Sequence, residues 1–332
     1  MNDFSMKPSL SDFNPLANER DLLSETEAEQ YRRNEIGAVG ENIVASFIKE
    51  NGLPGWRLLS NVWLSGDGSF ECNLLLLTEY AVHTFEVKHY TGHFTYENGY
   101  CKLGRIKLEQ DCIQQARKSY LRLLRLLREY DYNISVNGAL IFSSSKNKVV
   151  IESPVEDIHL FQLPDLYEYL ESIKRDEKTV PANPINHEAI IDFLKDYEIE
   201  NPFLPEPISE ERILTARKGI CCAMCRSFDV EHSKYYIACS CGYNESREEA
   251  IVRTACEYGV LTYDRNFKTG DIHDFIGKQA SLSYSQRVLA KYFVGIYKSS
   301  HSFYKNPGKN YTIIKKTFKF PNCAYFYRKY TT

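Results

Sequence analysis

Apolar positions follow two different periods along residues 24–200. Short apolar runs are typical of strands and occur at Arg57–Leu64, Glu71–Thr78, Tyr80–Lys88, His93–Glu97, Gly138–Phe142 and Val149–Ile151. Helical spacing occurs at Gly40–Glu50, Gln110–Tyr130, Leu163–Leu170 and Asn186–Tyr197. Strands interspersed with helices predict an α/β fold.

Two of the helical segments carry details that the structure can test. Ser24 and Glu27 have the spacing of a capping box and begin a helix, which we expect to break near Ile36-Gly37. In the helix over Gln110–Tyr130, three leucines repeat at core spacing: Leu121, Leu124 and Leu127. Three arginines beside them form either a solvated face or a rail for backbone phosphates: Arg122, Arg125 and Arg128.

The second half of the chain has a different organisation. Asn201–Pro207 holds three prolines and reads as a boundary, and cysteines cluster after it. Helices are expected at Glu245–Tyr258, Asp271–Ile276 and Ser283–Phe293. The expected organisation is a flexible arm (1–23), an α/β domain (24–200), a linker (201–216), a cysteine-rich module (217–260) and a basic aromatic region (261–332).

Composition limits the class of protein. The chain has 332 residues, of which 43% are hydrophobic and 26% charged, as in ordinary globular proteins. No apolar run approaches the ~20 residues of a membrane helix, and the N-terminus lacks the apolar core of a secretory signal. We therefore expect a cytoplasmic protein that does not bind membranes.

The net charge of −3 hides a basic C-terminal end, which has lysines and an arginine but no acidic residue after Lys298. Aromatic residues interleave with these cations, a pattern that suits phosphate binding and base stacking. A β-hairpin with an aromatic core would give the same composition. The candidate contacts to DNA or RNA are Lys305, Lys309, Lys315, Lys316 and Lys319.

Four of the ten cysteines have the spacing of a zinc ribbon. Cys222 and Cys225 form a C-x₂-C pair, and Cys239 and Cys241 follow as C-x-C. Four thiolates suit a structural Zn²⁺ with a closed tetrahedral shell. Two nearby residues could replace a ligand: Cys221 and His232. The alternative to a metal site is a group of buried free thiols.

The segment Glu86-Val87-Lys88 is the strongest candidate for chemistry. Residues two apart in a strand share a face, so Glu86 and Lys88 project together. A carboxylate beside an ammonium can hold Mg²⁺ and a water over a phosphodiester. An ordinary ion pair on an edge strand is the alternative.

The surrounding residues resemble a known family. Gly37-Ala38-Val39-Gly40-Glu41, followed by Glu86-Val87-Lys88-His89-Tyr90-Thr91-Gly92, resembles the nuclease-related domain, NERD, over roughly residues 33–172. That family is similar to the PD-(D/E)xK nucleases. The resemblance implies a restriction-endonuclease-like mixed sheet flanked by helices, and Mg²⁺-dependent cleavage of nucleic acid.

The resemblance also implies a set of catalytic residues. A helix glutamate (Glu41), the Glu86/Lys88 pair and a helix glutamine (Gln115) match the family pattern. Asn73 stands where the family has an aspartate, and Glu71, two residues earlier on the same strand, could supply the missing charge. Three functions stay open: a nuclease with Glu86 and Glu71 as magnesium ligands, a catalytically inactive nuclease fold that binds nucleic acid or serves as an adaptor, and a protein-interaction module.

Overall fold

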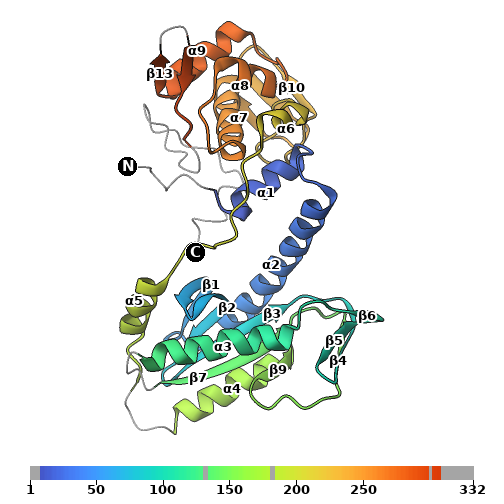
Figure 1. Ribbon diagram of the computed structural model, residues 1–332, viewed down its shortest axis with the longest axis vertical. Helices are drawn as coiled ribbons and strands as arrows, with labels where there is room; N and C mark the ends of the chain where they lie inside the picture. The colour runs from blue at the N-terminus through green and yellow to red at the C-terminus, as the bar shows by residue number, and fades with distance from the viewer. Residues whose placement is uncertain (1–7, 130–133, 180–183, 299–300, 308–332) are drawn as a thin grey trace. The chain divides into compact units, whose positions relative to one another are not determined.

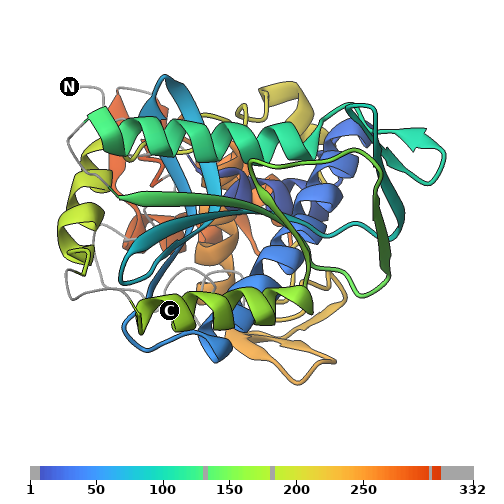
Figure 2. The ribbon, with the colours of Figure 1, turned by 90° about the horizontal axis from the view of Figure 1, so that it is seen from below.

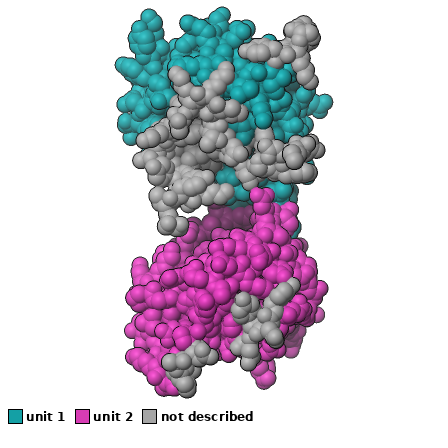
Figure 3. All heavy atoms as spheres, turned by 90° about the vertical axis from the view of Figure 1, so that its left-hand side faces the viewer, with its two compact units in different colours: residues 1–31, 203–332 teal, residues 32–202 magenta. Residues whose placement is uncertain are grey.

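A computed structural model describes residues 8–129, 134–179, 184–298 and 301–307. The chain divides into two compact units (Figure 3). Unit 2 comprises residues 32–202, and unit 1 comprises residues 1–31 and 203–332. Unit 1 is therefore built from both ends of the chain, whereas unit 2 is continuous in sequence.

The main sheet of unit 2 is mixed, with strand order β1-β2-β3-β7-β9. Its strands are β1 (Arg57–Gly66), β2 (Gly68–Leu77), β3 (Ala81–Lys88), β7 (Ser135–Phe142) and β9 (His159–Gln162). The first three pair antiparallel, as local hairpins do, and β3, β7 and β9 pair parallel. The structure thus confirms the mixed α/β class.

Helices cover both faces of this sheet, as Figures 1 and 2 show. One core holds apolar residues of β2, α3 (Cys112–Glu129) and α5 (His187–Tyr197). The other holds residues of β3, α2 (Glu25–Asn51) and α4 (Asp165–Glu177). A smaller sheet lies beside them, formed by β4 (Gly92–Glu97), β5 (Tyr100–Leu103), β6 (Ile106–Lys107) and β8 (Asn147–Ile151).

Two helices differ from their expected form. The capping box at Ser24 is present, but α2 continues through Gly37 without the expected break. A glycine inside a helix costs only about 1 kcal/mol, which tertiary packing overrides. In α3 the buried leucines are Leu123, Leu126 and Leu127, whereas Leu121 is exposed, because the buried stripe begins at Cys112 and Ile113.

Unit 1 is organised around α7 (Arg247–Leu261), whose residues from Ala250 onward are all buried. Around it lie α1 (Leu10–Glu19), α6 (Glu210–Thr215), α8 (Thr269–Phe275) and α9 (Leu282–Tyr292). Its strands are β10 (Val230–His232), β11 (Tyr236–Cys239), β12 (Asn244–Ser246), β13 (Gly295–Lys298) and β14 (His301–Tyr304). The helices share one core with β11 and β14.

This arrangement differs from the expected division of the chain. The range 1–23, expected as a flexible arm, contains α1, which Ser9 caps and which buries Phe13 and Leu16 in the core of unit 1. The expected border between 260 and 261 falls inside the core that α7 shares with α8 and α9. Within the described ranges, no helix has the length and apolar character needed to cross a membrane.

Candidate acidic site and cysteine centre

The acidic site lies where β2 and β3 separate. Their ladder runs from Leu77↔Val82 to Leu74↔Phe85 and then stops. Beyond that point β2 continues beside β1, and β3 continues beside β7 to Lys88. The segment that carries Glu86 and Lys88 therefore lies at a fork in the sheet.

Asn73 closes this fork. Its Oδ1 accepts a hydrogen bond from the Val87 amide at 3.0 Å, and its side chain is buried. The side-chain amide thus takes the place of the next ladder bond. Because this one oxygen already has a strand partner, Asn73 offers a cation less than an aspartate would.

Lys88 joins β3 to α3. Its Nζ lies 2.8 Å from Glu86 Oε1 and donates to Gln115 Oε1 at 2.9 Å. The preceding loop determines where Gln115 lies, because Asp111 accepts from the amides of Ile113 and Gln114 and so caps α3. Phe85 packs in the core with α2 and α4, so the alternation of the strand turns Glu86 and Lys88 toward α3.

Glu41 reaches the site because Gly40 lets α2 approach the ends of two strands. A Cβ at Gly40 would lie 2.6 Å from His89 Cβ and 2.7 Å from Ser143 Oγ. Real Cβ atoms do not come that close, so this contact requires glycine. His89 and Ser143 are themselves joined by a 2.9 Å hydrogen bond.

The charges of these groups perturb one another. Burial, followed by the charges of Glu71 and Glu86, raises the pKa of Glu41 to about 7. Burial and the charge of Glu86 raise the pKa of Glu71, although a hydrogen bond from Trp63 opposes the shift. Burial raises the pKa of Glu86 despite the neighbouring ammonium of Lys88.

For the ammonium of Lys88, in contrast to the carboxyl groups, the surroundings favour the charged form. Burial, the largest single effect, lowers the pKa of Lys88, but the charge of Glu86, its hydrogen bond and the smaller effects of neighbouring groups together outweigh burial and raise the pKa. Three carboxylates therefore share one ammonium in a poorly hydrated place. This donor set fits a divalent cation, which would offset the remaining negative charge.

The three carboxylates do not converge tightly. In the part of the chain that the structure describes, the four cysteines alone bring three or more His, Cys, Asp or Glu ligand atoms within 4.8 Å of one another. Magnesium needs only one or two carboxylates besides water and phosphate oxygens, so the looser arrangement is compatible with it.

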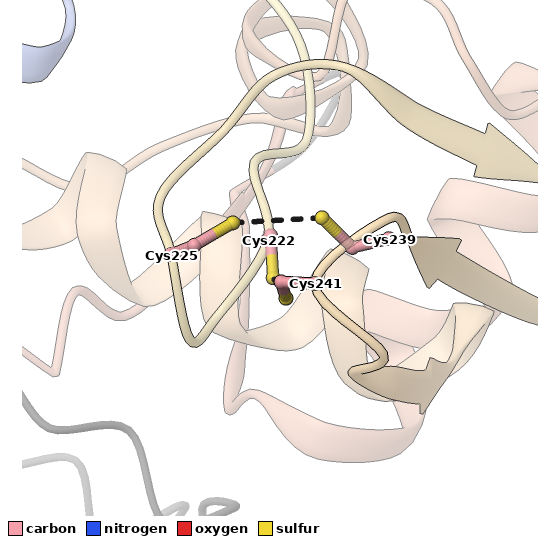
Figure 4. Close-up of side chains that lie close together, drawn as sticks. All are labelled: Cys222, Cys225, Cys239 and Cys241. Atoms are coloured by element: carbon pink, nitrogen blue, oxygen red, sulfur yellow. Dashed lines mark hydrogen bonds between the residues drawn. The ribbon is translucent and has the colours of Figure 1, made fainter.

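The cysteine centre is compact and can hold a metal ion (Figure 4). The Sγ atoms of Cys222 and Cys241 lie 3.6 Å apart, and those of Cys225 and Cys239 lie 3.5 Å apart. A tetrahedron with metal–sulfur bonds of about 2.3 Å has edges of about 3.8 Å, close to these separations. Met224 N–H also donates to Cys222 Sγ at 3.4 Å.

Neither alternative ligand belongs to this cluster. Cys221 is fully buried, and Arg253 donates to its carbonyl oxygen at 2.6 Å. His232 is exposed on β10.

A buried charge cluster, which the sequence analysis missed, lies behind the cysteine centre. Glu257 is fully buried and accepts from Arg20 at 3.0 Å, Arg226 at 2.9 Å and Arg253 at 2.7 Å. Burial raises the pKa of Glu257, but the three guanidinium groups outweigh it and hold the pKa far below its usual range. Because Arg226 follows Cys225 directly, the cluster ties α1 and α7 to the cysteine centre. Among these ion pairs, only Arg253 and Glu257 lie four positions apart on one helix, a spacing from which the sequence could have predicted the contact.

Of the five lysines predicted to contact nucleic acid, the structure describes only Lys305. Lys305 is exposed, and its amide donates to the Val294 carbonyl at 2.8 Å. The other candidates lie outside the described residues: Lys309, Lys315, Lys316 and Lys319.

Comparison with known proteins bears on unit 2. Residues 36–143 match the family model of NERD, the nuclease-related domain. The matched range of this NERD domain includes Glu41, the fork and Gln115, and it suggests a nuclease-related function that involves nucleic acid. No match was found among curated proteins or among solved structures. The cysteine centre lies outside the matched range.

Proposed function

We propose that the chain is a Mg²⁺-dependent phosphodiesterase that cleaves DNA or RNA, with its active site at the fork of a restriction-endonuclease-like NERD domain. The observation that carries the proposal is the position of Lys88, which bridges Glu86 and Gln115 beside two further carboxylates whose pKa values are raised.

Each residue has a role that follows from its chemistry. Glu86, Glu71 and Glu41 would hold the cation, which, when bound, polarises the phosphoryl group and acidifies a water. An ammonium has three N–H donors, and Lys88 directs two of them to Glu86 and Gln115. We assign the third to the attacking water or to a phosphate oxygen. Gln115 fixes the position of the ammonium.

Asn73 weakens this site without removing it. The amide keeps the fork closed, whereas an aspartate there would add a charge worth several kcal/mol at close range to a divalent ion. Glu71 supplies the charge instead. We therefore expect slow cleavage that needs a high concentration of Mg²⁺.

The test is metal-dependent cleavage of single- and double-stranded DNA and RNA by the wild type and a Lys88→Ala variant. Losing a group that positions the water costs about 10²–10⁴ in rate. Lys102→Ala is the matched control, because this lysine pairs with Glu97 on the smaller sheet of the same unit. Equal activity of the wild type and Lys88→Ala would remove the assignment.

The second candidate function is a catalytically inactive nuclease fold that binds nucleic acid or serves as an adaptor, and Asn73 favours it. Asn73→Asp separates the two. A rise in cleavage rate supports a weakened enzyme, in which Glu71→Gln should abolish activity. Nucleic-acid binding without cleavage, by the wild type and by the Asn73→Asp variant alike, supports the inactive fold.

For the cysteine centre we propose a structural Zn²⁺. Four thiolates prefer zinc to oxygen-seeking ions, and a closed shell leaves no position for a substrate. We further propose that Lys305, with the other candidate lysines, contacts nucleic acid, and that the protein acts in the cytoplasm.

A further inference from the structure

A row of cations on α3, half-buried at Arg122 and exposed at Lys118, Arg125 and Arg128, begins on the face that carries Gln115. Successive residues of a helix turn by about 100°, so Arg122 lies within about 20° of Gln115 around the axis. Lys118 and Arg125 lie about 60° and 80° away, and Arg128 about 140°. The expected stripe therefore divides, with Arg128 turned away from the side that meets Lys88.

Contacts with β2 and with the β1–β2 turn determine the direction of this face of α3. Ser119 Oγ donates to the Glu71 carbonyl at 2.8 Å. One turn later, Arg122 Nη1 donates to the Ser69 carbonyl at 2.9 Å, and Arg125 pairs with Asp67. The face thus follows β2 from Glu71 to the β1–β2 turn, starting at the acidic site.

Both arginines are held in place yet available to an anion. Arg122 uses one of its five N–H donors on Ser69 and lies 6.0 Å from the Phe70 ring centroid. The side chains of Arg125 and Asp67 are 57% and 71% exposed. An exposed pair is worth at most about 1 kcal/mol, so a phosphate can compete with Asp67 for Arg125.

We propose that Lys118, Arg122 and Arg125 form a phosphate track for one strand of a nucleic acid whose scissile phosphate lies at Lys88; this inference rests on the proposed function. With 1.5 Å of rise per residue, Arg122 and Arg125 lie about 10 and 15 Å along the axis from Gln115. Strand phosphates advance about 3.4 Å each along a duplex, so the track contacts phosphates about three to five nucleotides from the cut.

The experiment is a salt titration of oligonucleotide binding to the full chain, without added divalent cation, so that no cleavage is required. Each lost phosphate contact lowers the slope of log K against log[salt] by about 1. We expect that loss, with binding weaker by about fivefold or more, for Arg122→Ala and for Arg125→Ala. Arg122→Lys should recover most of the slope because it keeps the charge.

Arg128→Ala is the matched control, because it removes the same charge from the same helix on another face. It should keep the wild-type slope, and thermal melts should show that every variant is folded. If Arg122→Ala and Arg128→Ala reduce the slope equally, the track is wrong and the basic surface binds diffusely. If no variant changes the slope, the track is wrong and the cations serve another partner, such as an acidic protein.

The inference and the proposed function can fail separately. If the wild type shows no cleavage and the slopes change as expected, the phosphate track is supported and the proposed hydrolase activity is not. If the wild type cleaves with Mg²⁺ and the slopes stay unchanged, the hydrolase stands and the track does not. In an active enzyme, substrates with fewer than about three nucleotides on one side of the cut should lose the effect of Arg122→Ala.

Discussion

Glu41 carries the most informative electrostatic shift at the residue scale, because its pKa is raised to about 7 in the folded protein. A carboxyl with a raised folded pKa prefers the protonated form. The native state is therefore destabilised as the pH rises from about 4.5, where the unfolded group ionises, to about 7.

We expect Glu41→Gln to stabilise unit 2 at pH 8 by a few degrees in Tm, with no difference from the wild type below about pH 4.5. Thermal melts over this pH range, without added divalent cation, measure it. The exposed Glu50→Gln on the same helix is the control. A pH-independent difference would mean that burial and the neighbouring carboxylates do not raise the pKa of Glu41.

Asn73 allows a second prediction at this scale. Removing its Oδ1 in Asn73→Ala leaves the Val87 amide without its acceptor, and an unsatisfied buried donor costs about 1–3 kcal/mol. Urea unfolding of unit 2 should show this loss, whereas Asn42→Ala on the exposed side of α2 should not. Equal stability of the two variants would show that the Asn73 bond does not close the fork.

Helix α2 shows how one element depends on two glycines of different kinds. A Cβ at Gly40 meets His89 and Ser143, whereas a Cβ at Gly37 meets nothing within 4 Å. Gly40→Ala should therefore push α2 away from the site, destabilise unit 2 by about 1–3 kcal/mol and reduce cleavage. Gly37→Ala should stabilise the helix by about 0.5–1 kcal/mol. Denaturant unfolding compares them directly, and a shift of the same sign in both would contradict the close contact.

Comparison of the expected and observed elements shows which features the sequence predicts and which it does not. The strands β1, β2, β3 and β7 lie within a few residues of their expected ranges, because hairpins and periodic apolar runs are local signals. The contact at Gly40 and the hydrogen bond of Asn73 join residues that are far apart along the chain. No local pattern encodes them, so the sequence could propose Glu41 and Asn73 for the site but not show what holds them there.

At the scale of the whole molecule, the cysteine centre and the charge cluster predict how the units respond to metal removal. Structural zinc contributes on the order of 10 kcal/mol to small modules. If the cysteine centre holds the proposed zinc, its removal deprives the cysteine loops of their cross-link and Arg226 of its fixed place beside Glu257. Unit 1 should then unfold, while unit 2, whose core is separate, should not.

Tryptophan fluorescence can test this, because both tryptophans, Trp56 and Trp63, belong to unit 2. After chelation we expect an unchanged fluorescence melting transition together with a loss of helical circular dichroism. Cys225→Ser should reproduce the result without chelator. A retained circular dichroism spectrum, or a fluorescence transition that moves with it, would contradict the separate response.

Arg20 has one further consequence, for the order of events during synthesis. Its hydrogen-bond partners Arg217, Gly219 and Glu257 follow it by 197, 199 and 237 positions. Helix α1 is therefore synthesised long before any of these partners, and its guanidinium-bearing end finds none of them until residue 217 has been made. Residues 32–202 can fold in the meantime. A nascent chain stalled just after residue 202 has left the ribosomal exit tunnel should therefore hold a folded unit 2 and a helix α1 without its partners, which chaperones could bind.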